Sequence, residues 1–116
     1  MIPYSKQSIS KDDIANVVKV MRSSLLTQGE KLNLFETKLA KFVGSKYAVA
    51  VSSASAGLHL ACISLDVTKK DIVWTVPNTF VASASCALHC GAKVDFVDID
   101  EDTLNISIEK LKKKLS

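Results

Sequence analysis

The sequence predicts an α/β fold in which helices cover a mostly parallel β-sheet. Three short apolar runs, at residues 47–51, 72–76 and 93–98, have the character of buried strands. Helical patterns lie between these runs and after the last one. Strands that alternate with helices in this way form consecutive βαβ units, and their right-handed crossovers make the sheet parallel.

The composition limits both the number of domains and the class of function. The chain has 116 residues, of which 47% are hydrophobic and 23% are charged, so it holds one domain at most and no long disordered stretch. Its formal net charge of +3 is too small to indicate binding to nucleic acid or to a membrane surface. No apolar run approaches the roughly 20 residues that cross a bilayer. We therefore expect neither nucleic acid nor a membrane as a partner.

The cysteines indicate a reducing compartment. Cys62, Cys86 and Cys90 are an odd set in a chain whose start shows no secretory signal, so we expect reduced thiols in a cytoplasmic protein. Cys86, His89 and Cys90 resemble a set of metal ligands, but His89 and Cys90 point in different directions from a helix. A structural zinc also needs four ligands, and only His59 is left to complete the set. We predict no metal site and expect the cysteines to pack in the core.

Residues 1–44 are expected to form an N-terminal helical segment. Ser10 and Asp13 form a variant capping box at the start of one amphipathic helix. A second amphipathic helix follows a loop at residues 25–29, and Gly44 is well placed as its left-handed C-terminal cap. The apolar faces of the two helices are expected to carry Ile14, Val17, Val18 and Met21, and Leu32, Phe35, Leu39, Phe42 and Val43.

Residues 45–116 are expected to begin the α/β domain itself. The run at 47–51 is almost wholly apolar, as expected of a strand that is covered on both faces. Helices are expected over about 58–65, 80–90 and 107–116. No strand follows the last helix, so we interpret the region as the first, truncated part of a larger α/β domain.

A segment of small residues, Ser52-Ser53-Ala54-Ser55-Ala56-Gly57, lies between the first expected strand and the following helix. The free N–H groups of a helix's first turn and the helix dipole together bind anions. The small side chains allow a phosphate to approach the backbone, and Ser53 or Ser55 could donate a hydroxyl hydrogen bond. Ligands of open α/β sheets bind beyond the carboxyl ends of strands, which favours a phosphate site here. The alternative is that the serines only cap the helix.

A second feature, Pro77-Asn78-Thr79-Phe80, follows the next expected strand and should lie at the same edge of the sheet. Phe80 could stack on a planar ligand at this edge. The alternative is that Phe80 belongs to the core, because a phenylalanine after a turn is usually buried.

Five segments follow one another in an order and at a spacing that match a known family. They are Leu26–Gly29, Phe35-Glu36, Ser53–Ala61, Thr75–Ala82 and Gly91–Asp100. Together they resemble the opening of the DegT/DnrJ/EryC1/StrS family of nucleotide-sugar aminotransferases, which depend on pyridoxal 5'-phosphate (PLP). The start at Tyr4-Ser5 and the Pro-Asn-Thr-Phe turn look most like one branch of that family. This branch aminates C4 of a UDP-linked 4-keto-6-deoxy amino sugar on the route to pseudaminic acid.

The resemblance implies the N-terminal part of the large domain of a fold-type I PLP-dependent transferase, a three-layer α/β/α structure with a mostly parallel sheet. It also implies a homodimer with active sites near the subunit interface. Carried over residue by residue, Ala54 and Ser55, with the Ser53 hydroxyl beside them, would bind the PLP phosphate. Phe80 would stack on the pyridine ring.

Tyr4, Thr27 and Gly29 match segments that lie near the sugar substrate in the family. The resemblance implies that the complete enzyme transfers an amino group from glutamate, through pyridoxamine phosphate, to a 4-keto UDP-sugar used in cell-surface or flagellar glycans.

The catalytic residues are not assigned, because the lysine and the carboxylate that PLP transamination needs come from later segments in the family. Lys41, Lys46 and Lys93 are not credible substitutes, so we expect this chain alone to be inactive. Two alternatives stay open: a complete, non-catalytic phosphate- or nucleotide-binding α/β module, and a structural interaction domain.

Overall fold

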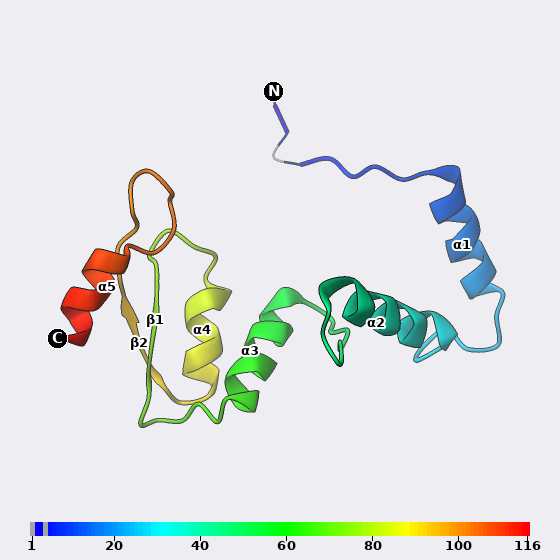
Figure 1. Ribbon diagram of the computed structural model, residues 1–116. Helices are drawn as coiled ribbons and strands as arrows, with labels where there is room; N and C mark the ends of the chain where they lie inside the picture. The colour runs from blue at the N-terminus through cyan, green and yellow to red at the C-terminus, as the bar shows by residue number, and fades with distance from the viewer. Residues whose placement is uncertain (1, 4) are drawn as a thin grey trace. The chain divides into compact units, whose positions relative to one another are not determined.

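The structure, a computed structural model, describes residues 2, 3 and 5–116 (Figure 1). Its elements are, in chain order, α1 (Lys11–Met21), α2 (Glu30–Val43), α3 (Ala54–Ser64), β1 (Ile72–Thr75), α4 (Ala82–His89), β2 (Lys93–Phe96) and α5 (Ile108–Leu115). The chain divides into two compact units. Met1–Ala50 contains α1 and α2, and Val51–Ser116 contains the other elements.

The capping box predicted at Ser10 begins α1. The Ser10 hydroxyl accepts the N–H of Asp13 at 3.1 Å, and the Asp13 carboxylate accepts the N–H of Ser10 at 2.8 Å. The hydrogen bond from the Ser10 backbone, followed by one from its hydroxyl, holds the pKa of Asp13 below its usual range, because both favour the ionised carboxylate. The predicted start of this helix is therefore confirmed.

The predicted cap at the end of α2 is also confirmed. Gly44 has φ 71° in the left-handed region, and its N–H donates to the carbonyls of Ala40 and Lys41. The N–H of Ser45 donates to the Ala40 carbonyl at 2.9 Å. A β-carbon at Gly44 would meet no atom within 4 Å, so backbone strain alone favours glycine there.

The prediction of a strand at residues 47–51 is wrong. The segment forms no strand, and the side chains of Tyr47 and Val49 are 73% and 74% exposed. Within the described residues it has no partner strand, and the N–H of Ala50 donates instead to the Glu36 carboxylate at 2.8 Å. A strand is stable only when its backbone joins a hydrogen-bonded ladder, which an apolar run by itself does not provide.

The sheet of the second unit consists of β1 and β2, which pair in parallel as expected. The register places Ile72 opposite Lys93 and Thr75 opposite Phe96. The helix between the strands, α4, packs on both of them, and α3 packs beside α4 (Figure 1). This confirms the α/β arrangement, with two strands where three were expected.

Small side chains form the centre of this second unit. The face that α4 turns inward carries Ala82, Cys86 and Ala87, and all three are buried. Ala92 and Val97, which flank β2, are buried as well. Because these side chains are small, the backbones of α4 and its neighbours can approach one another closely.

Two ion pairs connect α5 to β2 and the residues that follow it. Lys114 Nζ lies 2.5 Å from Asp95 Oδ2, and Lys110 Nζ lies 2.9 Å from Asp98 Oδ2. The Lys114 ammonium also lies 6.0 Å from the centre of the Trp74 ring. Hydrogen bonds from Lys114 and Lys110 hold the pKa values of Asp95 and Asp98 below the usual range, and Asp98 raises the pKa of Lys110.

We expect α5 to loosen from β2 in acid. The pKa values of Asp95 and Asp98 are lower in the folded chain than in the unfolded chain, where they are about 4. The two carboxylates therefore stabilise the fold fully above about pH 4. This stabilisation is lost as the pH falls through their folded-state pKa values. The contribution of Lys110 to stability has the opposite pH dependence, because its pKa is raised in the folded chain. Its contribution is complete below about pH 10.4 and is lost as the pH rises through the folded-state value. Urea unfolding followed from neutral to acidic pH measures the acid effect.

Lys114→Gln should lower stability at neutral pH and reduce the loss in acid, because this variant has already lost its ion pair. Lys113→Gln is the matched control, since no ion pair involves Lys113 in the part of the chain that the structure describes. Equal acid sensitivity of the wild type and both variants would show that the Lys114–Asp95 pair contributes nothing to stability.

Candidate functional site

The first turn of α3 has backbone donors without acceptors. Ser53 has an extended backbone (φ −160°, ψ 160°), and its hydroxyl accepts the N–H of Ala56 at 3.2 Å. Its carbonyl accepts the N–H of Gly57 at 3.1 Å. The N–H groups of Ala54 and Ser55 meet no protein acceptor in residues 2, 3 and 5–116. Two adjacent amide donors are therefore left for a ligand or for water.

The charge around this turn favours an anion. No acidic side chain lies in the first turn of α3, so no carboxylate neutralises the positive end of its dipole. Ser53, Ala54 and Ser55 are all exposed. The predicted cap is present at Ser53, and it leaves the two donors that a phosphate would need. The cap and the phosphate site are thus compatible with each other.

Phe80 lies directly before α4, in the turn that leads into that helix. Its side chain is 72% exposed, so the described residues do not bury it in a core. The Phe80 carbonyl accepts the N–H of Ser83 at 3.0 Å, and the hydroxyls of Thr79 and Ser83 lie 3.0 Å apart. These two interactions hold the turn and leave the aromatic ring open to a ligand.

The starts of α3 and α4 lie at one edge of the second unit. Figure 1 shows the two helices side by side, with their N-terminal ends at the end of the unit where β1 finishes. Because Ser53–Ser55 begin α3 and Phe80 lies directly before α4, they lie toward the same end of the second unit.

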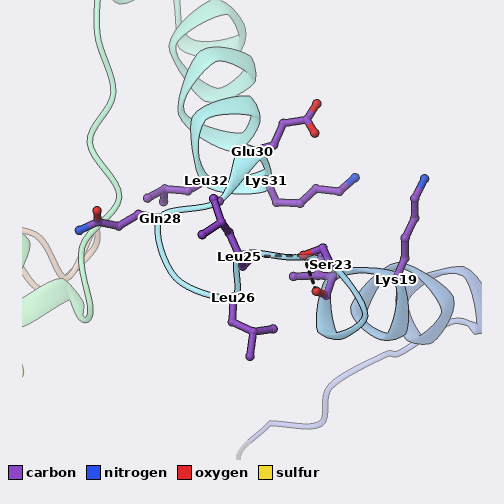
Figure 2. A pocket seen from close by; sticks show the side chains of 10 residues that line it. Lys19, Ser23, Leu25, Leu26, Gln28, Glu30, Lys31 and Leu32 are labelled. Carbon is purple, nitrogen blue, oxygen red and sulfur yellow. Dashed lines mark hydrogen bonds between the residues drawn. The ribbon is translucent and has the colours of Figure 1, made fainter.

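The loop between α1 and α2 encloses a cavity of about 320 Å³ (Figure 2). The Ser23 hydroxyl donates to the carbonyls of Val20 and Leu25 at 2.7 and 3.1 Å, which fixes the start of the loop. The cavity is lined by Lys19, Val20, Ser23, Leu25, Leu26, Gln28, Gly29, Glu30, Lys31 and Leu32.

Two backbone features shape this loop. Gln28 has φ 54°, a left-handed backbone conformation that residues other than glycine adopt only infrequently. A β-carbon at Gly29 would lie 3.0 Å from the Leu25 carbonyl oxygen, so a larger residue would push the loop apart. Glycine at this position therefore follows from the close approach of the backbone.

Two of the three residues expected near the sugar, Thr27 and Gly29, belong to this loop. Gly29 lines the cavity, and Thr27 belongs to the same loop but is not among the lining residues. Tyr4 lies outside the described residues. Lys19 and Lys31, which the sequence patterns did not single out, also line the cavity, and so does Glu30, which offsets part of their charge. The position of Lys31 two residues after Gly29 was the available signal.

The helices α3 and α4, which pack against each other, carry histidine and cysteine side chains. The rings of His59 and His89 lie 5.3 Å apart between centres. All three cysteines are free; Cys86 is buried, and Cys62 and Cys90 are half-buried. Burial first, and then the neighbouring thiols, raise the pKa of Cys62.

Two other kinds of feature are absent from the residues that the structure describes. These residues contain no group of three or more His, Cys, Asp or Glu side chains arranged to hold a metal ion. Among them, no helix combines the length and the apolar character that a membrane span requires.

Comparison with known sequences leads to one family. A family model described as "DegT/DnrJ/EryC1/StrS aminotransferase family" matches residues 7–116. The UDP-4-amino-4,6-dideoxy-N-acetyl-beta-L-altrosamine transaminase of Campylobacter jejuni is 44% identical over 115 residues, which are 99% of this chain and 30% of that protein. The spore coat polysaccharide biosynthesis protein SpsC of Bacillus subtilis is 44% identical over 110 residues, which are 95% of this chain and 28% of SpsC. The chain thus spans about 30% of the length of these curated relatives.

Solved structures show the same likeness. Helicobacter pylori PseC, an aminotransferase involved in the biosynthesis of pseudoaminic acid, has a TM-score of 0.88 and 34% identity over 96% of this chain and 30% of its own. The sugar aminotransferase CalS13 of Micromonospora echinospora has a TM-score of 0.87 and 34% identity over all of this chain and 32% of its own. These matches confirm the expected fold class, the N-terminal part of a PLP-dependent α/β transferase. The chain belongs to the DegT/DnrJ/EryC1/StrS aminotransferase family.

Proposed function

We propose that this chain is the N-terminal, cofactor-binding portion of a PLP-dependent sugar aminotransferase. The observation that carries the proposal is the pair of free N–H groups, on Ala54 and Ser55, at the start of α3. A phosphate dianion accepts such hydrogen bonds strongly, because a charged acceptor and the helix dipole act together. Related protein Spr1654 of Streptococcus pneumoniae, solved in PLP and PMP forms, supports this cofactor.

The residues present fit the cofactor at both of its ends. Ala54 and Ser55 would hold the phosphate through their amides, and the hydroxyls of Ser53 and Ser55 could add hydrogen bonds. Phe80, exposed at the same edge, would lie against the ring and fix its plane. When bound, PLP supplies an electron sink for negative charge that develops beside the amino group. The role of these four residues is to bind and orient it.

The proposed substrates are glutamate, as amino donor, and a UDP-linked 4-keto-6-deoxy sugar. The names of the Campylobacter transaminase and of Helicobacter PseC support this substrate class. We propose that Tyr4, Thr27 and Gly29 lie near the sugar. The cavity beside Gly29 supports this position, because its lining carries two lysines, Lys19 and Lys31, against one carboxylate, that of Glu30.

We further propose that residues 1–44 form a helical segment and that residues 45–116 begin the PLP-binding large domain. The whole protein would act as a cytoplasmic homodimer in the biosynthesis of surface polysaccharide, with pseudaminic acid as the product of its route. Its catalytic lysine would lie in the part of the family's length that this chain does not span.

The phosphate contact can be tested by Ala54→Pro, which removes one of the two donors. Proline is accepted at the first position of a helix, and Ser53 already has the extended backbone that a residue before proline prefers. Loss of one hydrogen bond to a charged group costs about 1.5–3 kcal/mol. We therefore expect the dissociation constant for PLP, measured by titration calorimetry, to rise about tenfold or more.

Lys11→Pro is the matched control, because Lys11 begins α1 after Ser10, another serine cap with an extended backbone. This variant should bind PLP as the wild type does, and circular dichroism should show that both variants keep their helices. Equal PLP affinity in Ala54→Pro and the wild type would exclude the α3 amides as the phosphate site.

The catalytic part of the proposal predicts that the 116-residue chain is inactive by itself. We expect no amino sugar when the chain is incubated with PLP, glutamate and a UDP-linked 4-keto-6-deoxy sugar, because the proposal places the catalytic lysine outside these 116 residues. Product formation would be followed by mass spectrometry, with a full-length relative as the positive control. Any turnover that depends on the chain would disprove the claim.

A further inference from the structure

The turn that carries Phe80 runs from the end of β1 to the start of α4 and has few backbone hydrogen bonds of its own (Figure 1). Among residues 2, 3 and 5–116, no carbonyl accepts the N–H of Asn78, Thr79 or Phe80. The carbonyl of Phe80 accepts the N–H of Ser83 at 3.0 Å. Backbone bonding therefore leaves much of the conformation of this turn unrestricted.

A pair of hydroxyl groups adds a restraint across the turn. Thr79 comes directly before Phe80, and its Oγ1 lies 3.0 Å from Oγ of Ser83, within hydrogen-bonding range. Phe80 thus lies inside a short loop of chain that is closed by two hydrogen bonds, one between the hydroxyls and one to its own carbonyl. These two bonds limit the φ and ψ angles that Phe80 can adopt.

The helix that carries the Ser83 hydroxyl is itself held by packing. α4 packs on β1, β2 and α3, and its residues Ala82 and Cys86 are buried. Ser83 is half-buried, whereas Thr79 is exposed. The hydroxyl pair therefore ties an exposed residue of the turn to a packed helix.

The orientation of the Phe80 ring depends on this restraint. The Phe80 side chain is 72% exposed, so neighbouring side chains do little to fix it. The rotamers that a side chain can adopt depend on the φ and ψ angles of its own backbone. A restraint on the backbone of Phe80 therefore limits the positions of its ring.

We propose that Thr79 and Ser83 are positioning residues, whose paired hydroxyls hold Phe80 in the orientation that stacks on the PLP ring. This inference rests on the proposed function, which places Phe80 against the cofactor. Neither hydroxyl touches PLP, and both act through Phe80. A residue that is already ordered before binding loses less conformational entropy on binding. The pair therefore strengthens binding of the cofactor's ring and not of its phosphate, which the amides of α3 hold.

Thr79→Val tests the proposal, because it removes the hydroxyl and keeps the shape of the side chain. We expect the dissociation constant for PLP, measured by titration calorimetry, to rise about three- to tenfold, because Phe80 regains conformational freedom in the free chain. Ser83→Ala should have a similar effect. The double variant should lose no more affinity than either single variant, since both remove the same hydrogen bond. Thr79→Ser keeps a hydroxyl and should bind PLP nearly as the wild type does.

Inorganic phosphate separates positioning of the ring from a general loss of structure. Phosphate has no ring, so the wild type, Thr79→Val and Ser83→Ala should bind it equally, as followed by the amide resonances of Ala54 and Ser55. Stacking on an aromatic ring shifts the proton resonances of PLP upfield, and this shift should be smaller in both variants.

Ser85→Ala is the matched control. Ser85 is another half-buried serine of α4, and its hydroxyl makes no hydrogen bond in the part of the chain that the structure describes. This variant should bind both PLP and phosphate as the wild type does.

Phe80→Ala tests whether the effect passes through the ring. This variant should bind PLP less tightly than the wild type, because the stacking contact is lost. In the Phe80→Ala background, Thr79→Val should cause no further loss, because no ring is left to orient.

Three results would overturn the proposal: equal PLP affinity in Thr79→Val and the wild type, a parallel loss of phosphate binding in Thr79→Val, or a further loss in the Phe80→Ala background. Each of them leaves the proposed cofactor site intact if the wild type binds PLP and Phe80→Ala binds it less tightly. Failure of the proposed function would be a different result, in which the wild type does not bind PLP or binds it no more tightly than Phe80→Ala, and this inference would fail with it.

Discussion

The candidate site depends on the fact that the first N–H groups of a helix need acceptors from outside the helix. Each of α1, α3 and α5 has a serine cap, but α1 and α5 also carry acidic side chains in their first turns. In α1, Asp13 therefore supplies negative charge from within the chain. The first turn of α3 has no acidic side chain, so its free amides and its dipole are left for an external anion. The same small residues that cap this helix also leave space at its backbone.

Local chemistry explains why several features could be predicted from the sequence. The caps at Ser10 and Gly44 depend on residues within four positions of each other, so a short pattern is sufficient. The parallel pairing of β1 with β2 follows from the length of the helical connection between them. The serine cap at the start of α3 could be predicted for the same reason, because a helix start needs only a few small residues and a capping side chain.

The remaining features depend on contacts between distant residues. The segment at 47–51 has the composition of a strand, but its state depends on a partner strand, and Ala50 instead binds the side chain of Glu36. Exposure of Phe80 could not be predicted from its neighbours alone, since core and ligand-binding aromatics follow similar turns. The contact between α3 and α4 depends on how the two helices pack, which helix periodicity does not specify.

The most direct measurement of the central claim is the response of individual backbone amides to PLP, followed by ¹H–¹⁵N NMR. If the first turn of α3 holds the phosphate, the amide resonances of Ala54 and Ser55 should shift most, and they should also shift when inorganic phosphate is added alone. The amide of Ala56, which already donates to Ser53, should change less. The account would be contradicted if the Ala54 and Ser55 resonances did not move while PLP bound elsewhere on the chain.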